Sequence, residues 1–370
     1  MLETVLHSNN PEICRPMLEA VLQKAEHFQQ KYGRAPVFME VCGSHTMALA
    51  KTGVKQALMD KVQLISGPGC PVCVTAQESI DSMIGLAQNE DTIICTFGDM
   101  MRVPGSKRSL MEEKTAGKDI RVLYSPIDAI AIAEANPEKE IIFLGIGFET
   151  TIPILALLVQ TAERKQVKNF SIWMTTKLVE PILRFLLNAG EIQLDGFILP
   201  GHVSIVLGEN AYLFLPQEYQ IPGVITGFEL AELLSGINKL LDLSLSQKAA
   251  ILNDHSSVVT KEGNRVAQGL MNQYFTTCDE AWRGIGIIPA SGLDFKAEYD
   301  FYNAKKKFPI HKVTIKKTKC RCGEVIRGII EPNQCPLFAK ACHPLHPIGP
   351  CMVSSEGSCS AYYQYMRESL

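Results

Sequence analysis

The sequence predicts an α/β protein with two similar parallel-sheet domains that face each other across a cleft, plus a third domain of helical and irregular structure. Short runs rich in Val, Ile and Phe recur along the middle of the chain, and most end in a Gly-, Ser- or Thr-containing turn that leads into a helical pattern. This series restarts near residue 138. We therefore expect a first domain at 33–137, a second at 138–242, and a third that combines 1–32 with 243–370.

Local patterns place the individual elements. In the first domain we expect strands at 36–41, 61–66, 91–97 and 119–124, and helices at 77–88 and 127–135. Asn136 and Pro137 end the last of these helices, because proline cannot continue one. In the second domain we expect strands at 140–145, 170–175, 196–199 and 223–226, and helices at 151–163, 179–189 and 228–241. Beyond Leu243 the strand pattern fades into helical and then Pro- and Cys-rich sequence, and we expect a helix at 16–32 to complete this third domain.

The composition is that of a protein with sizeable hydrophobic cores. The chain has 370 residues, 46% of them hydrophobic and 20% charged, and its net charge of -3 gives no electrostatic case for binding nucleic acid. The first residues lack a basic stretch followed by an apolar run, and the longest aliphatic stretch, at 152–159, is too short to span a bilayer. We therefore expect a cytoplasmic protein without a membrane partner. Thiols stay reduced there, so the twelve cysteines are expected to be metal ligands, redox thiols or buried small residues rather than structural disulfides.

Unusual residues gather where the expected strands end. The segments CGSHT, GPGCPVC and FGDMMRVPGS follow the first three strands, and GFETT and PGHVS follow two strands of the second half. In open parallel sheets, the loops at the carboxyl ends of the strands line the ligand crevice. Two such domains facing one another would line a cleft with these five loops.

Two of these loops carry cysteines. Cys70 and Cys73 form a Cys-x-x-Cys at a strand-to-helix turn, where helix amides lower a thiol pKa and where the two sulfurs can reach each other. Half of a zinc site, or two inert buried thiols, are the alternatives, although the chain has no second Cys-x-x-Cys. Cys42 lies three residues before His45, so it could be a nucleophile with a base, a soft metal ligand, or a packed thiol.

Two further strand ends present polar side chains. Glu149 lies in GFETT, where backbone amides could cradle an anion, but the third glycine of the dinucleotide fingerprint is absent, since Thr150 stands there. His202 lies in PGHVS, and the alternative to a functional role is a structural histidine whose hydrogen bonds are satisfied within the fold.

The C-terminal part contains a cysteine tetrad of spacing C-x12-C-x6-C-x8-C, formed by Cys322, Cys335, Cys342 and Cys351. Its irregular, Pro-rich surroundings suit a cubane iron–sulfur cluster, but the spacing alone leaves zinc and [4Fe-4S] nearly even. Spacing does not exclude Cys320 and Cys359 as further ligands.

Together, the motifs MEVCGSHT, GPGCPVC, TFGDMMRVPGS, GFETT, PGHVS and CRCGEVIRG followed by CPLF and GPCMVSSEG closely resemble the HypD family, the maturation factors of [NiFe] hydrogenases. They run in one order from about Phe38 to Tyr363. The resemblance implies an assembly scaffold that acts with the small chaperone HypC to build an Fe(CN)2CO group. It also implies that cyanide arrives from a thiocyanate on HypE and that the finished group passes to the hydrogenase large subunit.

The resemblance also implies roles for the cysteines. Cys42 would be the iron ligand shared with a chaperone cysteine, Cys70 and Cys73 a redox pair, and the C-terminal tetrad the ligands of a [4Fe-4S] cluster. From position alone we expect His45, His202 and Glu149 to handle protons or to orient the incoming ligand.

Two other hypotheses stay open. The chain could be a stand-alone thiol–disulfide oxidoreductase similar to ferredoxin:thioredoxin reductase, which leaves CGSHT and GFETT without a role. It could also be a zinc-stabilised binding module without redox chemistry. Whether it turns over as an enzyme is not decided by its sequence.

Overall fold

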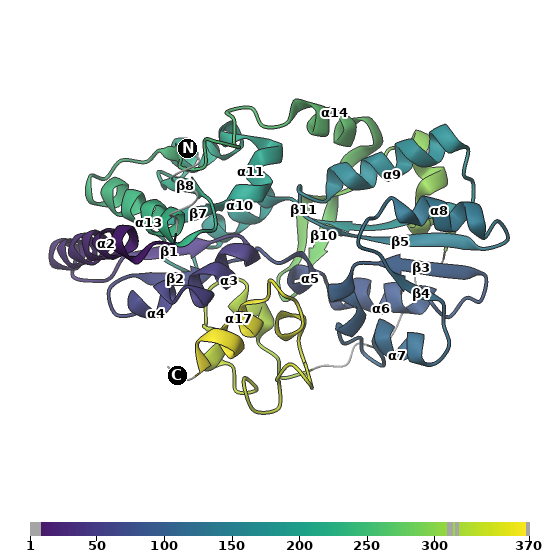
Figure 1. The fold of residues 1–370 in the computed structure, drawn as a ribbon, viewed down its shortest axis with the longest axis horizontal. Helices are drawn as coiled ribbons and strands as arrows, with labels where there is room; N and C mark the ends of the chain where they lie inside the picture. Colours follow the sequence, from purple (N-terminus) through teal and green to yellow (C-terminus); the bar gives the residue numbers. More distant parts are fainter. Residues whose placement is uncertain (1–8, 309–313, 315–317, 368–370) are drawn as a thin grey trace.

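The computed structural model describes residues 9–308, 314 and 318–367 and contains two parallel sheets (Figure 1). The larger sheet has, in spatial order, the strands β2 (Gln63–Ser66), β1 (Val37–Glu40), β7 (Gly196–Pro200), β8 (Gly223–Thr226) and β9 (Ile251–Asn253). The smaller sheet has the order β4 (Ile120–Val122), β3 (Thr92–Thr96), β5 (Glu140–Gly147) and β6 (Phe170–Thr176). Neighbouring strands in both sheets run parallel, which confirms the α/β class.

The strands lie where the sequence predicted them, but they pair differently. The expected contiguous division at residue 138 is wrong as a description of the sheets, because β1 and β2 join β7, β8 and β9, while β3 and β4 join β5 and β6. The chain thus enters the smaller sheet after β2 and returns after β6. A run of Val and Ile marks a strand locally, whereas its neighbour in the sheet is chosen by packing between distant segments.

One face of the larger sheet is covered by α2 (Pro11–Tyr32), α3 (Gly43–Lys51), α4 (Val54–Ala57) and α13 (Leu230–Leu245), which share a core with β1, β2, β7 and β8. The expected placement of the N-terminal helix in the third domain is therefore wrong. Asn10 caps α2, and the helix packs along α13, where Lys24 pairs with Asp242 and Lys31 Nζ donates to the carbonyl of Leu245 (Figure 1).

The two faces of the smaller sheet are buried in different cores. In β5, Ile141 and Phe143 point to one core, and Ile142 and Leu144 point to the other, as the alternation of a strand requires. The first core includes α8 (Asp128–Ala135), α9 (Ile152–Lys165) and α14 (Arg265–Tyr274). The second core continues into the larger sheet and contains α5 (Pro71–Val74), α6 (Gln77–Leu86), α7 (Leu110–Thr115), α10 (Val179–Ala189), α11 (Gly201–Leu207) and α12 (Phe214–Glu218).

The expectation that strands end near Leu243 is wrong. Besides β9, the antiparallel strands β10 (Phe275–Trp282) and β11 (Gly286–Phe295) form a hairpin between the two sheets (Figure 1). Short helices follow: α15 (Ala304–Lys307), α16 (Cys322–Val325) and α17 (Ser358–Tyr365). Single 3-10 turns occur at Gly98–Arg102, Glu209–Tyr212, Ala297–Tyr302, Pro332–Gln334 and Pro350–Met352.

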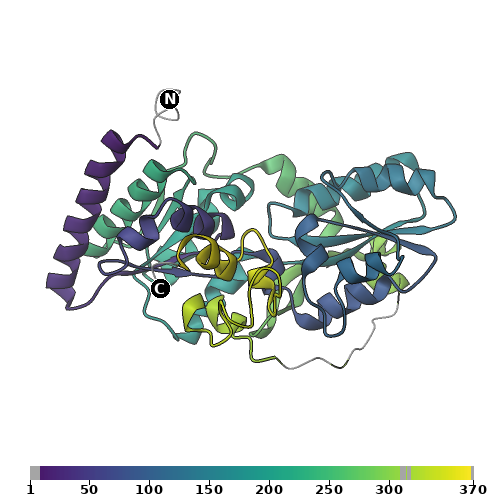
Figure 2. The ribbon, with the colours of Figure 1, turned by 60° about the horizontal axis from the view of Figure 1, so that its bottom comes forward.

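The cysteine-rich C-terminal segment, residues 318–367, forms an irregular unit that lies below the sheets in Figure 1 and in front of them in Figure 2. It packs against α3 and α5. Its own small core consists of residues such as Phe338, Met352 and Tyr362, joined by Ala50 from α3. Among the described residues, no helix is both long and apolar enough to cross a membrane.

Candidate functional site

The loops that follow β1 and β2 lie against each other. Cys42 immediately precedes α3, and Cys70 immediately precedes α5. The amide of Gly43 donates to the carbonyl of Gly69 at 3.2 Å. A Cβ on Gly69 would lie 2.4 Å from the Cα of Cys42, so only glycine fits at this position. The side-by-side pairing of β1 and β2 thus brings the two cysteine loops into backbone contact.

Cys70 and Cys73 form a disulfide, with Cα atoms 5.2 Å apart. Pro71 begins α5, a position that suits proline because its missing N–H would be unpaired there. The amide of Cys73 donates to Cys70 Sγ at 3.1 Å. Cys70 is 5% exposed and Cys73 1% exposed, so the disulfide is buried, and its reduction would take two electrons.

A cavity of ≈160 Å³ opens beside Cys42 and is lined by residues that follow strands of both sheets. Its walls include Cys42, Ser44, Gly69, Thr150, His202 and Glu356. Burial raises the pKa of the Cys42 thiol to about 11, and the carboxylate of Glu356 raises it further. Hydrogen bonds from the amides of His45 and Ser44 act in the opposite direction and lower this pKa. Cys42 is therefore a neutral thiol until a metal ion displaces its proton or a base accepts it.

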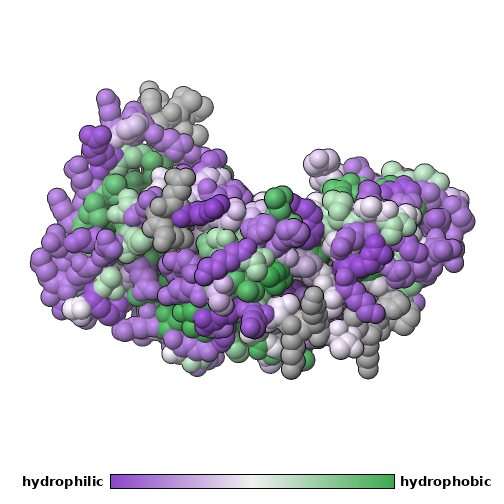
Figure 3. Space-filling view, turned by 90° about the horizontal axis from the view of Figure 1, so that it is seen from below, coloured by the Kyte–Doolittle hydropathy of each residue, from purple (hydrophilic) through white to green (hydrophobic). Residues whose placement is uncertain are grey.

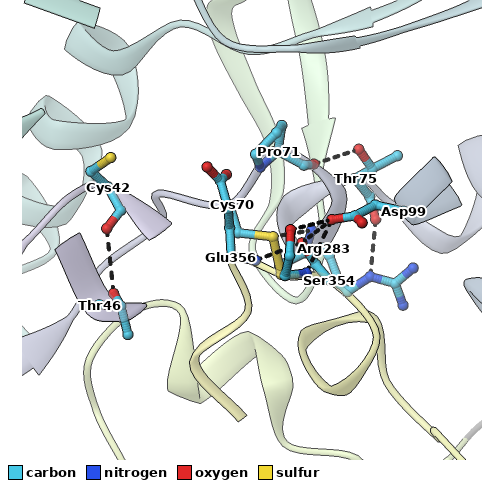
Figure 4. Close-up of a disulfide and its surroundings, with 11 residues drawn as sticks. Cys42, Thr46, Cys70, Pro71, Thr75, Asp99, Arg283, Ser354 and Glu356 are labelled. Carbon is cyan, nitrogen blue, oxygen red and sulfur yellow. Dashed lines mark hydrogen bonds between the residues drawn. A yellow bond between two sulfur atoms is a disulfide. The ribbon is translucent and has the colours of Figure 1, made fainter. Parts of the chain in front are cut away.

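Glu356 connects this cavity to the cysteine-rich segment. Ser44 Oγ donates to Glu356 Oε1 at 2.8 Å, and a Cβ on Gly43 would lie 2.5 Å from Glu356 Cβ. Burial raises the pKa of Glu356, while the Ser44 hydrogen bond opposes that rise. Figure 4 shows Glu356 between Cys42 and the disulfide. A carboxylate that can take up a proton thus stands beside the thiol.

His45 does not line the cavity. It is completely buried, and its Nε2 lies 3.2 Å from the carbonyl of Thr226 and 3.0 Å from that of Gly227, so this nitrogen carries the hydrogen. Burial lowers its pKa to about 4. His45 stacks on one side of Phe228, and His202, which does line the cavity, stacks on that ring too. Of the two expected histidines, only His202 reaches the cavity beside Cys42.

Glu149 is buried next to the cavity, at 3% exposure. Its Oε1 accepts the amide hydrogen of Val179 at 2.8 Å, and its Oε2 has no hydrogen-bond partner among the described residues. Burial raises the pKa of this carboxyl to about 7, against the Val179 hydrogen bond. Glu149 can therefore gain or lose a proton near neutral pH.

The C-terminal cysteines gather around a second, small and mostly apolar cavity. All four members of the expected tetrad line it and are buried, and Cys320 and Cys359 line it as well. The amide of Ile348 donates to Cys342 Sγ at 3.3 Å. The fold therefore brings together thiols that are separated by up to 39 positions in the sequence.

Asp99 ties this cysteine segment to the loop after β3, and Arg283 ties the β10–β11 hairpin to the disulfide helix (Figure 4). Asp99, in the loop after β3, accepts hydrogen bonds from the hydroxyl of Ser354 and from the amide and hydroxyl of Ser355. Arg283, after β10, donates from its backbone amide to Val74 and from Nε to Thr75, the residues that directly follow the disulfide.

Sequence reasoning missed Asp99, Glu356 and Arg283 as residues of the site. Asp99 and Glu356 stand inside the motifs FGDMMRVPGS and GPCMVSSEG, but nothing local shows that these loops meet. Arg283 precedes the two glycines of a hairpin turn, in a region where we expected no strands.

Comparisons with known proteins give a consistent result. A family model named HypD, described as the "Hydrogenase formation hypA family", matches residues 16–366. The chain is 39% identical to hydrogenase maturation factor HypD of Escherichia coli, over 97% of this chain and 96% of that protein. It is 40% identical to HypD of Rhodobacter capsulatus, over 96% of each chain, and 41% identical to HypD of Cupriavidus necator, over 89% of each.

Proposed function

The chain belongs to the HypD family and has a role in hydrogenase maturation, and we propose that it assembles the Fe(CN)2CO group of [NiFe] hydrogenases with Cys42 as an iron ligand. The observation that carries this proposal is the contact between the Cys42 loop and the disulfide loop at one cavity. A soft thiolate suits low-spin iron with diatomic ligands. A dithiol beside it can supply the electrons that ligand transfer requires.

The electron balance of cyanide transfer explains the need for that dithiol. Release of cyanide from a thiocyanate breaks its S–C bond: R–S–CN gains two electrons and two protons and becomes R–SH and HCN. Reduced Cys70 and Cys73 lose two electrons and two protons when they form their disulfide. One oxidation of this pair therefore balances the release of one cyanide.

Proton transfer completes the proposed chemistry. Cys42 must lose its proton to bind iron, and Glu356 and His202 line the same cavity, where either can accept it. Glu149, with its raised pKa, can exchange a proton near neutral pH from its buried position next to that cavity. His45 is proposed instead to hold the loop after β1 against Thr226 and Gly227.

The chemistry of the C-terminal cysteines suits a [4Fe-4S] cluster. Six buried or half-buried thiols around one apolar space provide more than the four thiolates that a cluster needs, and we propose Cys322, Cys335, Cys342 and Cys351 as its ligands. When bound, such a cluster supplies single electrons.

The proposed partners are HypC, whose cysteine would share the iron with Cys42, and HypE, which would deliver the thiocyanate. The hydrogenase large subunit would then receive the finished group. A stand-alone thiol–disulfide oxidoreductase is a weaker proposal, since Cys70 and Cys73 are buried and a protein disulfide could not reach them without an opening of the loops.

The test is anaerobic co-purification with HypC. The wild-type complex is expected to show infrared bands of bound cyanide and CO, and Cys42→Ala is expected to lose both the bands and the partner. Cys278→Ala is the matched control, because Cys278 lies on β10, outside the cavity. A Cys42→Ala complex with unchanged infrared bands would remove Cys42 as the iron ligand.

A further inference from the structure

A large cavity of ≈770 Å³ borders the cavity of the C-terminal cysteines. Its walls are the start of α6, the loop 104–106, the turn between β10 and β11, and the stretch that contains Cys320 and Cys322. Figure 3 shows the molecule from below, with hydrophobic residues among hydrophilic ones on that face.

The cavity reaches both redox elements. Cys320, Cys322 and Gly349 line it and also line the cavity of the C-terminal cysteines, so these three residues form a shared wall. A Cβ on Gly349 would lie 2.6 Å from Cys320 Sγ, so the wall is thin because glycine stands there. On its other side, the cavity is lined by Ala76 and Gln77, directly after the disulfide helix.

The hairpin turn forms one edge of the cavity and is firmly held. Gly284 packs closely on Gly323, so that a Cβ on Gly284 would lie 2.5 Å from the Cα of Gly323. Both Gly284 and Gly286 have positive φ, 70° and 107°, which glycine adopts without strain. The turn presents Ile287, whose side chain is 73% exposed, beside the opening.

Two exposed lysines flank this opening. Lys107 and Lys319 are adjacent in sequence to lining residues, whereas Glu78 is the acidic residue in the lining. Arg283 lies in the cavity wall, and among the described residues its Nη2 is buried without a hydrogen-bond partner. A basic rim around an apolar side chain attracts and orients an acidic protein partner.

We propose that this cavity is the docking site of a small acidic one-electron carrier protein of the ferredoxin class, which delivers electrons next to Cys320 and Cys322. The proposal rests on the proposed redox function. Two carriers each lose one electron, and the Cys70–Cys73 disulfide gains two electrons and two protons from water to become two thiols. The role in hydrogenase maturation does not name such a donor. The thin wall shared with the cysteine cavity and the exposed Lys107 and Lys319 support this one.

The experiment uses the iron-loaded protein and a reduced, negatively charged bacterial ferredoxin as the probe. Binding is measured at low and high salt, and reduction is followed from the absorbance of the iron centre. The variant Lys107→Glu with Ile287→Glu places two acidic groups at the opening. We expect about 10-fold weaker binding and slower reduction at low salt, with a weaker salt dependence than wild type.

The control variant is Lys168→Glu with Val266→Glu, which makes the same two changes at exposed positions outside the cavity. It should bind like wild type, and dithionite, which needs no docking, should reduce all three proteins equally. If the cavity variant binds ferredoxin as tightly as wild type does, the docking site is overturned. The same conclusion follows if dithionite reduces the wild-type protein but ferredoxin does not bind to it. If dithionite fails to reduce the wild-type iron centre, the redox function itself fails.

Discussion

Glu149 gives a quantitative prediction for the pH dependence of stability. In the unfolded chain its carboxyl has a pKa of 4.5, and burial in the folded protein raises the pKa to about 7. Below pH 4.5 the group is protonated in both states and contributes nothing. Between pH 4.5 and 7 the unfolded chain releases its proton while the folded protein keeps it, so stability falls as the pH rises. At about 1.4 kcal/mol per pKa unit, the loss is about 3 kcal/mol above pH 7.

The substitution Glu149→Gln removes this loss and keeps the shape of the side chain. Its amide oxygen can still accept the hydrogen bond from Val179. The variant should therefore match wild type near pH 4.5 and become more stable by about 3 kcal/mol at pH 8. His45 has the opposite effect, because its pKa is lowered from 6.5 to about 4 and folding stability is lost as the pH falls through that window.

The measurement is urea denaturation of both proteins, without iron and without oxygen, at several pH values between 4.5 and 8. The difference between the two curves isolates Glu149, because His45 contributes equally to both. Glu138→Gln, on an exposed carboxyl that is not among the charges acting on Glu149, serves as the control and should not remove the loss of stability with rising pH. A constant difference between Glu149→Gln and wild type across the whole range would refute the reasoning.

Three further predictions concern the loops around the site. Gly69→Ala would press a methyl group against the Cys42 backbone and should cost about 1–3 kcal/mol of stability in urea denaturation, and it should also weaken the proposed binding of HypC. Gly269→Ala, which has open space around its Cβ, should be neutral or stabilising in the same assay. Lys55→Met should cost about 3–5 kcal/mol of folding stability, because Glu40 would keep a buried charge without its partner. Adding Glu40→Gln should recover part of that stability, and a double variant as unstable as Lys55→Met would show that the unpaired charge is not the cause. The unreduced, iron-free wild type has twelve cysteines and one disulfide, so a thiol titration should count ten thiols. Cys73→Ser has eleven cysteines and no disulfide, so its count should rise to eleven. A count of nine would show that Cys70 pairs with another cysteine.

Local sequence patterns placed the strands well. Runs such as those at β5 and β6 bury side chains on both faces, so they show continuous hydrophobicity that a single stretch reveals. The turn after β2 was also predictable from the local sequence, because Pro71 suits the first position of a helix. The hairpin was missed, since β10 carries exposed polar residues and a bulge near Cys278, and β11 contains Pro289 and two glycines, which do not read as a strand.

The sequence alone determined the α/β class, the cysteine loops at the strand ends and the family. Tertiary structure decided that β1 and β2 pair with β7 and β8, and that Asp99, Arg283 and Glu356 meet the cysteine loops. It also decided that His45 is buried away from the cavity that His202 lines. The physical reason is distance along the chain: contacts between residues hundreds of positions apart depend on how whole sheets pack, and a local pattern carries no record of that.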